Sequence, residues 1–235
     1  MIYVTSDLHG FSLEKFKLLL KKADFSSNDF LFVLGDVIDR GNEGIELLNW
    51  MMLQPNVQLI LGNHEAMLLS CDFVFDEITE NSIRSLSAEK LELLNNYNDN
   101  GGGVTLKALR ELMQTDPDTV ADILDYLREA PLYETVSLNG KDFLLVHSGL
   151  DNFDPKKPLS QYSADDLIWA WPDIETRYFD DVITVFGHTP TMSYDHMSKG
   201  KILHTDTRID IDVGVPYGCS PALLRLDDLE EIYLD

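Results

Sequence analysis

Side chains that can bind a divalent cation stand directly after five short apolar runs of this sequence. The runs are rich in leucine, β-branched and aromatic residues, and such short continuous runs are typical of strands buried on both faces. Carboxylates, imidazoles and amide oxygens all bind divalent cations, so each strand end could supply a ligand. The residues are Asp7 and His9 after residues 2–6, Asp36 after 30–34, Asn63 and His64 after 57–61, His147 after 143–146, and His188 after 182–186.

The geometry of parallel strands offers a physical reason for these residues to meet. In open α/β sheets, ligands bind beyond the carboxyl ends of the strands, so neighbouring strands would gather side chains from Asp7 to His188 into one cluster. Each residue singly could instead be an ordinary turn residue that ends a strand. Because the pattern recurs after five runs and takes four of the six histidines of the chain, it favours a shared site.

The segment after the second run places two carboxylates and a guanidinium close together, at Asp36, Asp39 and Arg40. Asp39 and Arg40 taken alone would be a surface ion pair, which contributes little to stability. Beside a metal-binding Asp36, however, a planar guanidinium can grip two oxygens of a phosphate. Whether Asp39 and Arg40 have this role depends on the sequence motif that contains them.

Helical patterns separate the first three runs. Apolar residues recur at helical spacing in residues 13–22, after Ser12 as a possible cap, and in residues 43–53, before Pro55. The N-terminal part is therefore predicted to be a parallel β-α-β-α-β unit.

The rest of the chain has two further patterns. Amphipathic helical segments between residues 66 and 130, interrupted by flexible glycines at 101–103, predict a helical cap inserted into the core. Asn139 and Gly140 suit a type I′ turn between two strands. Strand-like segments in residues 201–235 predict further antiparallel strands, some of them in a second sheet.

Composition narrows the class of protein. The formal net charge is -23, from 41 acidic and 18 basic residues, which repels nucleic acids and anionic membranes. The apolar runs stop well short of the ~20 residues that a membrane span needs, and no signal peptide pattern opens the chain. Two cysteines, Cys71 and Cys219, are expected to be reduced thiols. We expect a cytoplasmic globular protein without nucleic-acid or membrane partners.

Five sequence blocks also carry a family resemblance. In chain order, SDLHG, GDVIDRG, GNHE, VHSGL and FGHTP resemble the signature blocks of the calcineurin-like metallophosphoesterases, and most closely those of the phosphoprotein phosphatase branch in its compact bacterial and phage form. The resemblance covers residues 1–66 and about 132–215. It implies a single domain over residues 1–235, folded as a four-layer α/β/β/α sandwich with the helical cap inserted at about 66–130.

The resemblance further implies a centre of two metal ions. Asp7 and His9 would hold the first metal, Asn63, His147 and His188 the second, and Asp36 would bridge both. Mixed nitrogen and oxygen donors without thiolate suit Mn, Fe, Zn or Co, and we expect Mn to serve in an assay. Two such ions roughly 3.5–4 Å apart would activate a water molecule as the nucleophile.

Catalytic roles follow for the neighbouring residues. His64 is then free to protonate the leaving group, and the resemblance makes Asp39 its carboxylate partner. Arg40 and Asn63 would contact the phosphate.

The sequence departs from the family pattern at one position. Trp171 stands where compact bacterial members often have a second phosphate-gripping arginine, and Arg177 is the arginine of that segment that could replace it.

Three functions are compatible with these observations. The favoured one is a phosphoprotein phosphatase acting on phosphoserine, phosphothreonine or also phosphotyrosine, or on small phosphoesters. The alternative is a symmetrical hydrolase of dinucleoside polyphosphates such as diadenosine tetraphosphate. A catalytically silent binding module ranks last, because all the expected ligands and the His64 and Asp39 pair are present. The oligomeric state is left open.

Overall fold

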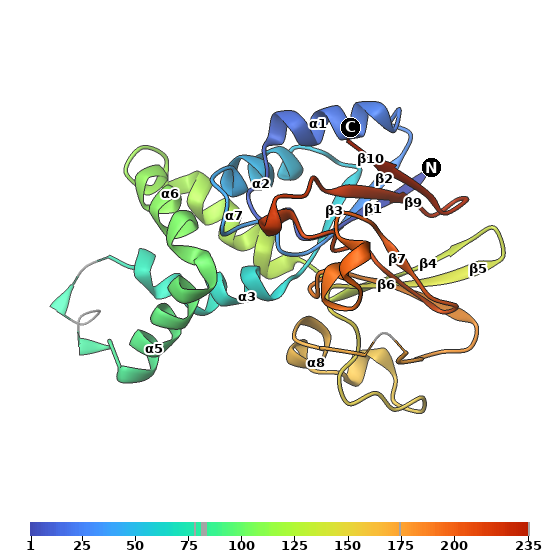
Figure 1. The fold of residues 1–235 in the computed structure, drawn as a ribbon. Helices are drawn as coiled ribbons and strands as arrows, with labels where there is room; N and C mark the ends of the chain where they lie inside the picture. The colour runs from blue at the N-terminus through green and yellow to red at the C-terminus, as the bar shows by residue number, and fades with distance from the viewer. Residues whose placement is uncertain (78, 81–83, 174, 235) are drawn as a thin grey trace.

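Two sheets of five strands each form the centre of the computed structural model, which describes residues 1–77, 79–80, 84–173 and 175–234 (Figure 1). The first sheet contains β1 (Ile2–Thr5), β2 (Phe30–Leu34), β3 (Val57–Ile60), β9 (Ala222–Arg225) and β10 (Glu230–Tyr233), in the order β10-β9-β1-β2-β3. The second contains β4 (Tyr133–Leu138), β5 (Lys141–Val146), β6 (Val182–Phe186), β7 (Leu203–His204) and β8 (Arg208–Asp210), in the order β4-β5-β6-β8-β7.

The first sheet begins with the predicted β-α-β-α-β unit. Strands β1, β2 and β3 are parallel and are connected by α1 (Leu13–Lys22) and α2 (Gly44–Met52). Ser12 occupies the N-cap position of α1, although its side chain makes no capping hydrogen bond. Strands β9 and β10 extend this sheet in antiparallel fashion from the β1 edge.

The second sheet contains the predicted hairpin and one unpredicted pairing. Asn139 (φ 52°) and Gly140 (φ 75°) both have positive φ, as a type I′ turn between β4 and β5 requires. The C-terminal strands β7, β9 and β10 are antiparallel to their neighbours, as expected, whereas β8 is parallel to β6. For β8 the expectation holds for its pairing with β7 but not for its pairing with β6, because residues 187–207 form a connection long enough to return the chain to the start of the sheet.

Alternating side chains divide the interior into three apolar layers. Along β2, Leu31 and Val33 pack against the helices, while Phe32 and Leu34 face the second sheet. Strand β5 alternates in the same way, since Phe143 and Leu145 meet the first sheet, whereas Leu144 and Val146 pack against α8 (Ala164–Ile168). Helices, two sheets and an outer layer with α8 therefore form the expected layered α/β sandwich.

Helices also fill the stretch between β3 and β4. They are α3 (Asn63–Ser70), α5 (Ala88–Tyr97), α6 (Gly103–Met113) and α7 (Pro117–Glu129), and a π-helical turn (Asn98–Gly102) joins α5 to α6. Leu109 of α6 and Ile123 of α7 are fully buried in the core shared with α1 and α2, so this part of the insertion belongs to the main body (Figure 1). The bounds of a single domain at 1–235 and of a cap at 66–130 stay predictions.

Two smaller expectations also have an outcome in the structure. Cys71 and Cys219 are free thiols, and burial raises the pKa of Cys71, which fits a packed side chain. Within the described residues, no helix is both long enough and apolar enough to cross a membrane.

Candidate active site

The carboxyl ends of β1, β2, β3, β5 and β6 bring the predicted ligands together. Asp36 lies in the middle of them. One oxygen of its carboxylate is 3.6 Å from Nε2 of His9 and 3.8 Å from Nε2 of His64, and the other is 3.4 Å from Nε2 of His147. Asp36 belongs to two separate groups of potential metal ligands, one with His9 and His64 and one with His147 and His188. This shared position is the geometry that a bridging carboxylate needs.

The backbone at this centre is unusual. Six of its residues have φ between 42° and 70°, in the left-handed region that side chains other than glycine rarely occupy. Each such residue costs roughly 1–3 kcal/mol and persists when its surroundings hold it there, and such residues cluster at functional sites. They are Asp7, His9, Asp36, Asp39, Arg40 and His188.

Glu65, which the sequence analysis did not single out, holds this backbone in place. Its fully buried carboxylate accepts hydrogen bonds from the backbone N–H groups of Asp36 (2.8 Å) and Val37 (2.8 Å), and longer ones from Ile38 (3.3 Å) and Gly62 (3.2 Å). The signal was its place as the last residue of the GNHE block, at the start of α3.

His9, Asp7 and Asp36 are the residues predicted to hold the first metal. Nδ1 of His9 faces the carbonyl of Ile38 at 3.2 Å, so Nδ1 carries the proton and the lone pair of Nε2 points into the site. Asp7 Oδ1 lies 3.9 Å from that Nε2. The other oxygen of Asp7 accepts hydrogen bonds from the Ser6 hydroxyl and from the backbone N–H of His188. Asp7 is thus oriented with Oδ1 toward His9.

The second group surrounds the side chain of Asn63. Its Oδ1 lies 2.9 Å from Nε2 of His147 and 3.0 Å from Nδ1 of His188. Nδ1 of His147 donates to the carbonyl of Leu34 at 2.6 Å, so the lone pair of Nε2 is directed at Asn63. If the Asn63 amide turned round, its nitrogen could donate to the same atoms. In both orientations one ring nitrogen of His147 and one of His188 face the same atom of Asn63, an arrangement that fits ligands around a cation.

The electrostatics of the centre fit divalent cations. Burial raises the pKa of Asp36 well above its ordinary value and also raises that of Asp7, because the protein offers these carboxylates little compensating charge. Burial lowers the pKa of His9 well below its usual range and that of His188 to about 2, so both imidazoles are neutral. Neutral nitrogens beside buried carboxylates suit a metal, since a cation supplies the missing positive charge.

A histidine and aspartate pair adjoins the metal ligands. Nδ1 of His64 lies 2.6 Å from Oδ2 of Asp39, and both side chains are buried. Burial lowers the pKa of His64, but the charge of Asp36 and the hydrogen bond and charge of Asp39 outweigh it, so the pKa is raised above its usual value. Nε2 of His64 faces the centre. The pair therefore has the geometry of an oriented general acid.

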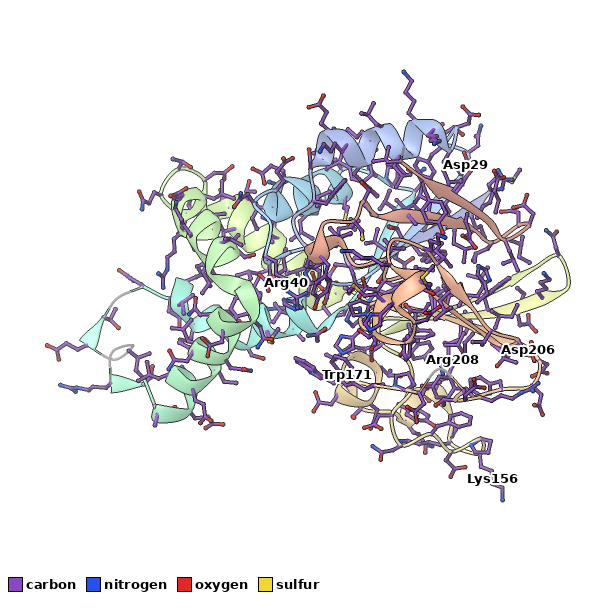
Figure 2. All side chains as sticks on the ribbon, viewed as in Figure 1. Asp29, Arg40, Lys156, Trp171, Asp206 and Arg208 are labelled. Carbon is purple, nitrogen blue, oxygen red and sulfur yellow. The ribbon has the colours of Figure 1, made fainter. Side chains whose placement is uncertain are left out.

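Arg40 lies at the mouth of the site, with an exposed side chain (Figure 2). Its guanidinium contacts Nε2 of His9 through Nη1 and Nε2 of His64 through Nη2, both at 3.1 Å. Arg177 is placed elsewhere, on the surface, where it forms an ion pair with Asp180 at 3.1 Å. No contact between Arg177 and the metal ligands is found in the described part of the chain, so its predicted phosphate-binding role gains no support.

Two tryptophans flank the site beside His188. The rings of Trp171 and His188 have centroids 4.9 Å apart, and those of Trp169 and His188 are 6.1 Å apart. Trp171 is 67% exposed and Trp169 is 38% exposed. Trp171 therefore offers a flat aromatic surface where the family resemblance led us to expect an arginine.

Arg208, also missed from the sequence, holds two residues, Asp173 and Thr176, that follow these tryptophans. Its side chain is buried, and Nη1 donates to the carbonyls of Asp173 (2.6 Å) and Thr176 (2.9 Å). The guanidinium lies 4.5 Å from the centre of the Phe186 ring, within cation–π range. Arg208 and Trp171 are both labelled in Figure 2.

A layered α/β sandwich with these donors at its strand ends and an adjoining His–Asp pair defines a metal-dependent phosphoesterase. The chain belongs to the calcineurin-like phosphoesterase family, whose model matches residues 1–213. Members of this class are hydrolases, and the candidate ligand groups agree with metal binding.

Individual relatives add detail. The chain is 35% identical over 97 residues to the symmetrical bis(5'-nucleosyl)-tetraphosphatase of Buchnera aphidicola subsp. Schizaphis graminum, covering 40% of this chain and 34% of that protein. It is 25% identical over 203 residues to the protein of the same name from Chromobacterium violaceum, covering 83% of this chain and 59% of that protein. The chain thus spans less than two thirds of the length of both relatives.

A solved structure agrees at the level of the fold. The crystal structure of a protein provisionally named a diadenosine tetraphosphatase superposes on this chain with a TM-score of 0.62 and 17% sequence identity. The superposition covers 99% of this chain and 92% of that one. The expected superfamily, fold and hydrolase class are therefore confirmed. The narrower expectation of the phosphoprotein phosphatase branch is not supported, since the sequence relatives carry the tetraphosphatase name. The alternative function, a symmetrical hydrolase of dinucleoside polyphosphates, agrees better with these relatives.

Proposed function

We propose that this protein hydrolyses nucleoside polyphosphates, cutting a dinucleoside tetraphosphate between its two middle phosphates. The observation that carries the proposal is the exposed ring of Trp171 beside His188, 4.9 Å away between centroids. An exposed indole gains little from packing, but stacking of a nucleobase on an aromatic ring is worth about 1–3 kcal/mol. The names of the sequence relatives support the same substrate class.

A second candidate binding surface adjoins His9 and Arg40. A hollow of about 550 Å³ borders His9 and Arg40 and is also lined by Phe11, Lys15 and Pro216. Apolar walls with two cations suit a nucleoside that carries phosphates. A substrate with a nucleoside at each end could therefore span the centre, with one base at Trp171 and the other end in this hollow.

Metal ions would be held by the two ligand groups that share Asp36: Asp7 and His9 on one side, and Asn63, His147 and His188 on the other. When bound, divalent cations neutralise phosphate charge and lower the pKa of water. Arg40 would bind phosphate oxygens with its planar guanidinium. The cations and Arg40 would offset the net charge of -23 locally for an anionic substrate.

The chain's own residues account for the proton on the leaving group. Water adds its oxygen to one middle phosphorus and releases a proton to the solvent, from which His64 is reprotonated after the reaction, and the bond from that phosphorus to the bridging oxygen breaks. The bridging oxygen leaves on the second nucleoside diphosphate and takes a proton from Nε2 of His64. Asp39 orients the imidazole through Nδ1, at 2.6 Å. Two nucleoside diphosphates are the products.

The test compares two substrates on one Mn-loaded preparation, with a chelated control. We expect kcat/KM for diadenosine tetraphosphate to exceed that for a phosphothreonine peptide by at least about tenfold, because the peptide lacks a base to stack. ADP should be the sole nucleotide product. A preference for the peptide would overturn the proposal and restore the phosphoprotein phosphatase prediction. Formation of ATP and AMP would overturn the symmetrical cut.

The structure and the relatives do not test three other expectations from the sequence. Manganese as the metal, a cytoplasmic location and the absence of nucleic-acid partners stay predictions. A small phosphoester substrate agrees with the family and with the sequence relatives.

A further inference from the structure

The helical insertion reaches the catalytic pair through two hydroxyl groups. Oδ1 of Asp39 accepts hydrogen bonds from the Tyr97 hydroxyl at 2.7 Å and from Oγ1 of Thr105 at 2.6 Å. Tyr97 ends α5 and Thr105 lies in the first turn of α6. Tyr97 and Asp39 are fully buried and Thr105 nearly so, which protects these bonds from competition with water.

The glycines between these helices permit this approach. A Cβ atom on Gly102 would lie 2.4 Å from the ring of Tyr97, so a side chain there would displace the tyrosine. Gly101 has φ 99°, and its carbonyl accepts a hydrogen bond from the backbone N–H of Arg40 at 3.1 Å. The glycines expected to be a flexible interruption instead pack closely against the segment that carries Asp39 and Arg40.

The two hydroxyls fix the orientation of the Asp39 carboxylate. Without them, the carboxylate could rotate about its last bond, since that torsion is broad. With Oδ1 held by Tyr97 and Thr105, Oδ2 faces Nδ1 of His64 at 2.6 Å. Thr105 closes a ring of contacts, because its Oγ1 also accepts a hydrogen bond from the backbone N–H of Asp39 at 3.0 Å.

The proton on the Tyr97 hydroxyl is secure. Burial and the neighbouring Asp39 raise the pKa of Tyr97 far above its ordinary value, so the group acts as a donor at any working pH. Within the described chain, the side chains that bond to the Asp39 carboxylate are His64, Tyr97 and Thr105. Two of the three come from the insertion.

We propose that Tyr97 and Thr105 are positioning residues, which hold Asp39 so that His64 presents its proton to the leaving group. The helical insertion is then part of the catalytic apparatus and not merely a cover. This inference rests on the proposed function in one respect, the assignment of His64 as the general acid. It predicts that loss of either hydroxyl harms the reaction in proportion to how much the leaving group needs a proton.

The experiment uses the full chain, loaded with Mn, and two aryl phosphates of different leaving-group basicity. Phenyl phosphate needs a proton on its leaving oxygen, whereas 2,4-dinitrophenyl phosphate does not. For Tyr97→Phe and Thr105→Val we expect kcat on phenyl phosphate to fall by about tenfold or more, since general acids contribute 10²–10⁴-fold. On 2,4-dinitrophenyl phosphate, kcat should stay within about twofold, because its departure needs no acid.

Two variants serve as controls. Thr105→Ser keeps the hydroxyl and should retain near-wild-type kcat on both substrates. Tyr126→Phe removes a hydroxyl from α7 of the same insertion and should leave the ratio of the two rates unchanged. If Tyr97→Phe fails to fold, the comparison of Thr105→Val with Thr105→Ser carries the test.

A further variant, His64→Asn, tests the general-acid role of His64 separately from the positioning role of Tyr97 and Thr105. If His64→Asn slows both substrates equally, the general-acid role itself is wrong. If His64→Asn acts selectively on phenyl phosphate but Tyr97→Phe and Thr105→Val slow both substrates equally or neither, the positioning role alone is overturned. Selective losses in all three variants would support both.

Discussion

Nδ1 of His64 and Oδ2 of Asp39 are 2.6 Å apart, in a part of the interior where both residues are at most 1% exposed. Such a short bond between an imidazole and a buried carboxylate fixes which ring nitrogen faces the partner and which faces the reaction. Nε2 of His64 is left pointing toward Asp36 and Arg40. The relationship leads to two predictions about catalysis.

Replacing His64 by asparagine should separate catalysis from metal binding. His64→Asn removes the proton donor but none of the six residues predicted to hold the metals, so we expect kcat on diadenosine tetraphosphate to fall by ~10² or more. Elemental analysis of the purified variant should show wild-type metal content. Equal kcat in variant and wild type would contradict the assignment.

The pH dependence of the reaction should respond to Asp39. The hydrogen bond and charge of Asp39 both raise the pKa of His64, so Asp39→Asn should lower that pKa. The protonated imidazole would then be lost at a lower pH. We expect the alkaline limb of the kcat profile to move to lower pH in Asp39→Asn. A limb that stays in place would mean that another group limits the rate there.

Asp36 should govern the loading of both metals. Asp36→Asn removes one negative charge and the ability to bridge, because an amide offers one good oxygen ligand. We expect the metal content after dialysis to fall well below that of the wild type, together with activity. Asp206→Asn, on an exposed residue labelled in Figure 2, is the control and should load fully. Full loading of Asp36→Asn would exclude a bridging role.

Glu65 should act on stability as well as on the site. Glu65→Gln replaces one carboxylate oxygen by an NH₂ group, which cannot accept a hydrogen bond. Buried backbone N–H groups that donate to this oxygen in the wild type would therefore be left unpaired. We expect the free energy of unfolding to fall by about 2 kcal/mol or more in denaturant titrations, with reduced activity. Glu46→Gln, on the exposed face of α2, should change it by about 0.5 kcal/mol at most. Similar values for both variants would contradict the role of Glu65.

Trp171 should determine affinity for the nucleoside. Trp171→Ala removes the proposed stacking surface, so KM for diadenosine tetraphosphate should rise about tenfold, as a loss of 1–3 kcal/mol implies. Trp171→Phe keeps a ring and should recover much of the affinity. With β-glycerol phosphate, which has no ring, the three proteins should have the same KM. A uniform rise of KM on both substrates would point to damage of the site instead.

Much of the site could be predicted from local sequence. Apolar runs followed by Asp, Asn or His predicted the strand ends, and the sheet order then brought those residues together around Asp36. The prediction was possible because parallel strands place their carboxyl ends at one edge. The antiparallel pairing expected for the last strands holds between β8 and β7 but not between β8 and β6, because a local pattern reports that a strand forms and not which neighbour it joins.

Other residues were missed because their role depends on a distant partner. Tyr97, Thr105 and Arg208 look ordinary in the sequence, and Glu65 had only its place in the GNHE block. Each acts through hydrogen bonds to groups that the chain brings close only on folding. Arg177 shows the converse. Its place in the sequence suggested a phosphate-binding role, whereas the structure places it in a surface ion pair with Asp180.

The sequence by itself determined the kinds of ligand, their order along the strands and the class of chemistry, because these depend on residue type and on short-range periodicity. Only the tertiary structure decided that α5 and α6 hold Asp39 and that Trp171 adjoins His188. Those contacts join residues between 17 and 66 positions apart. Packing of whole elements selects them, and no local preference of the chain reports them in advance.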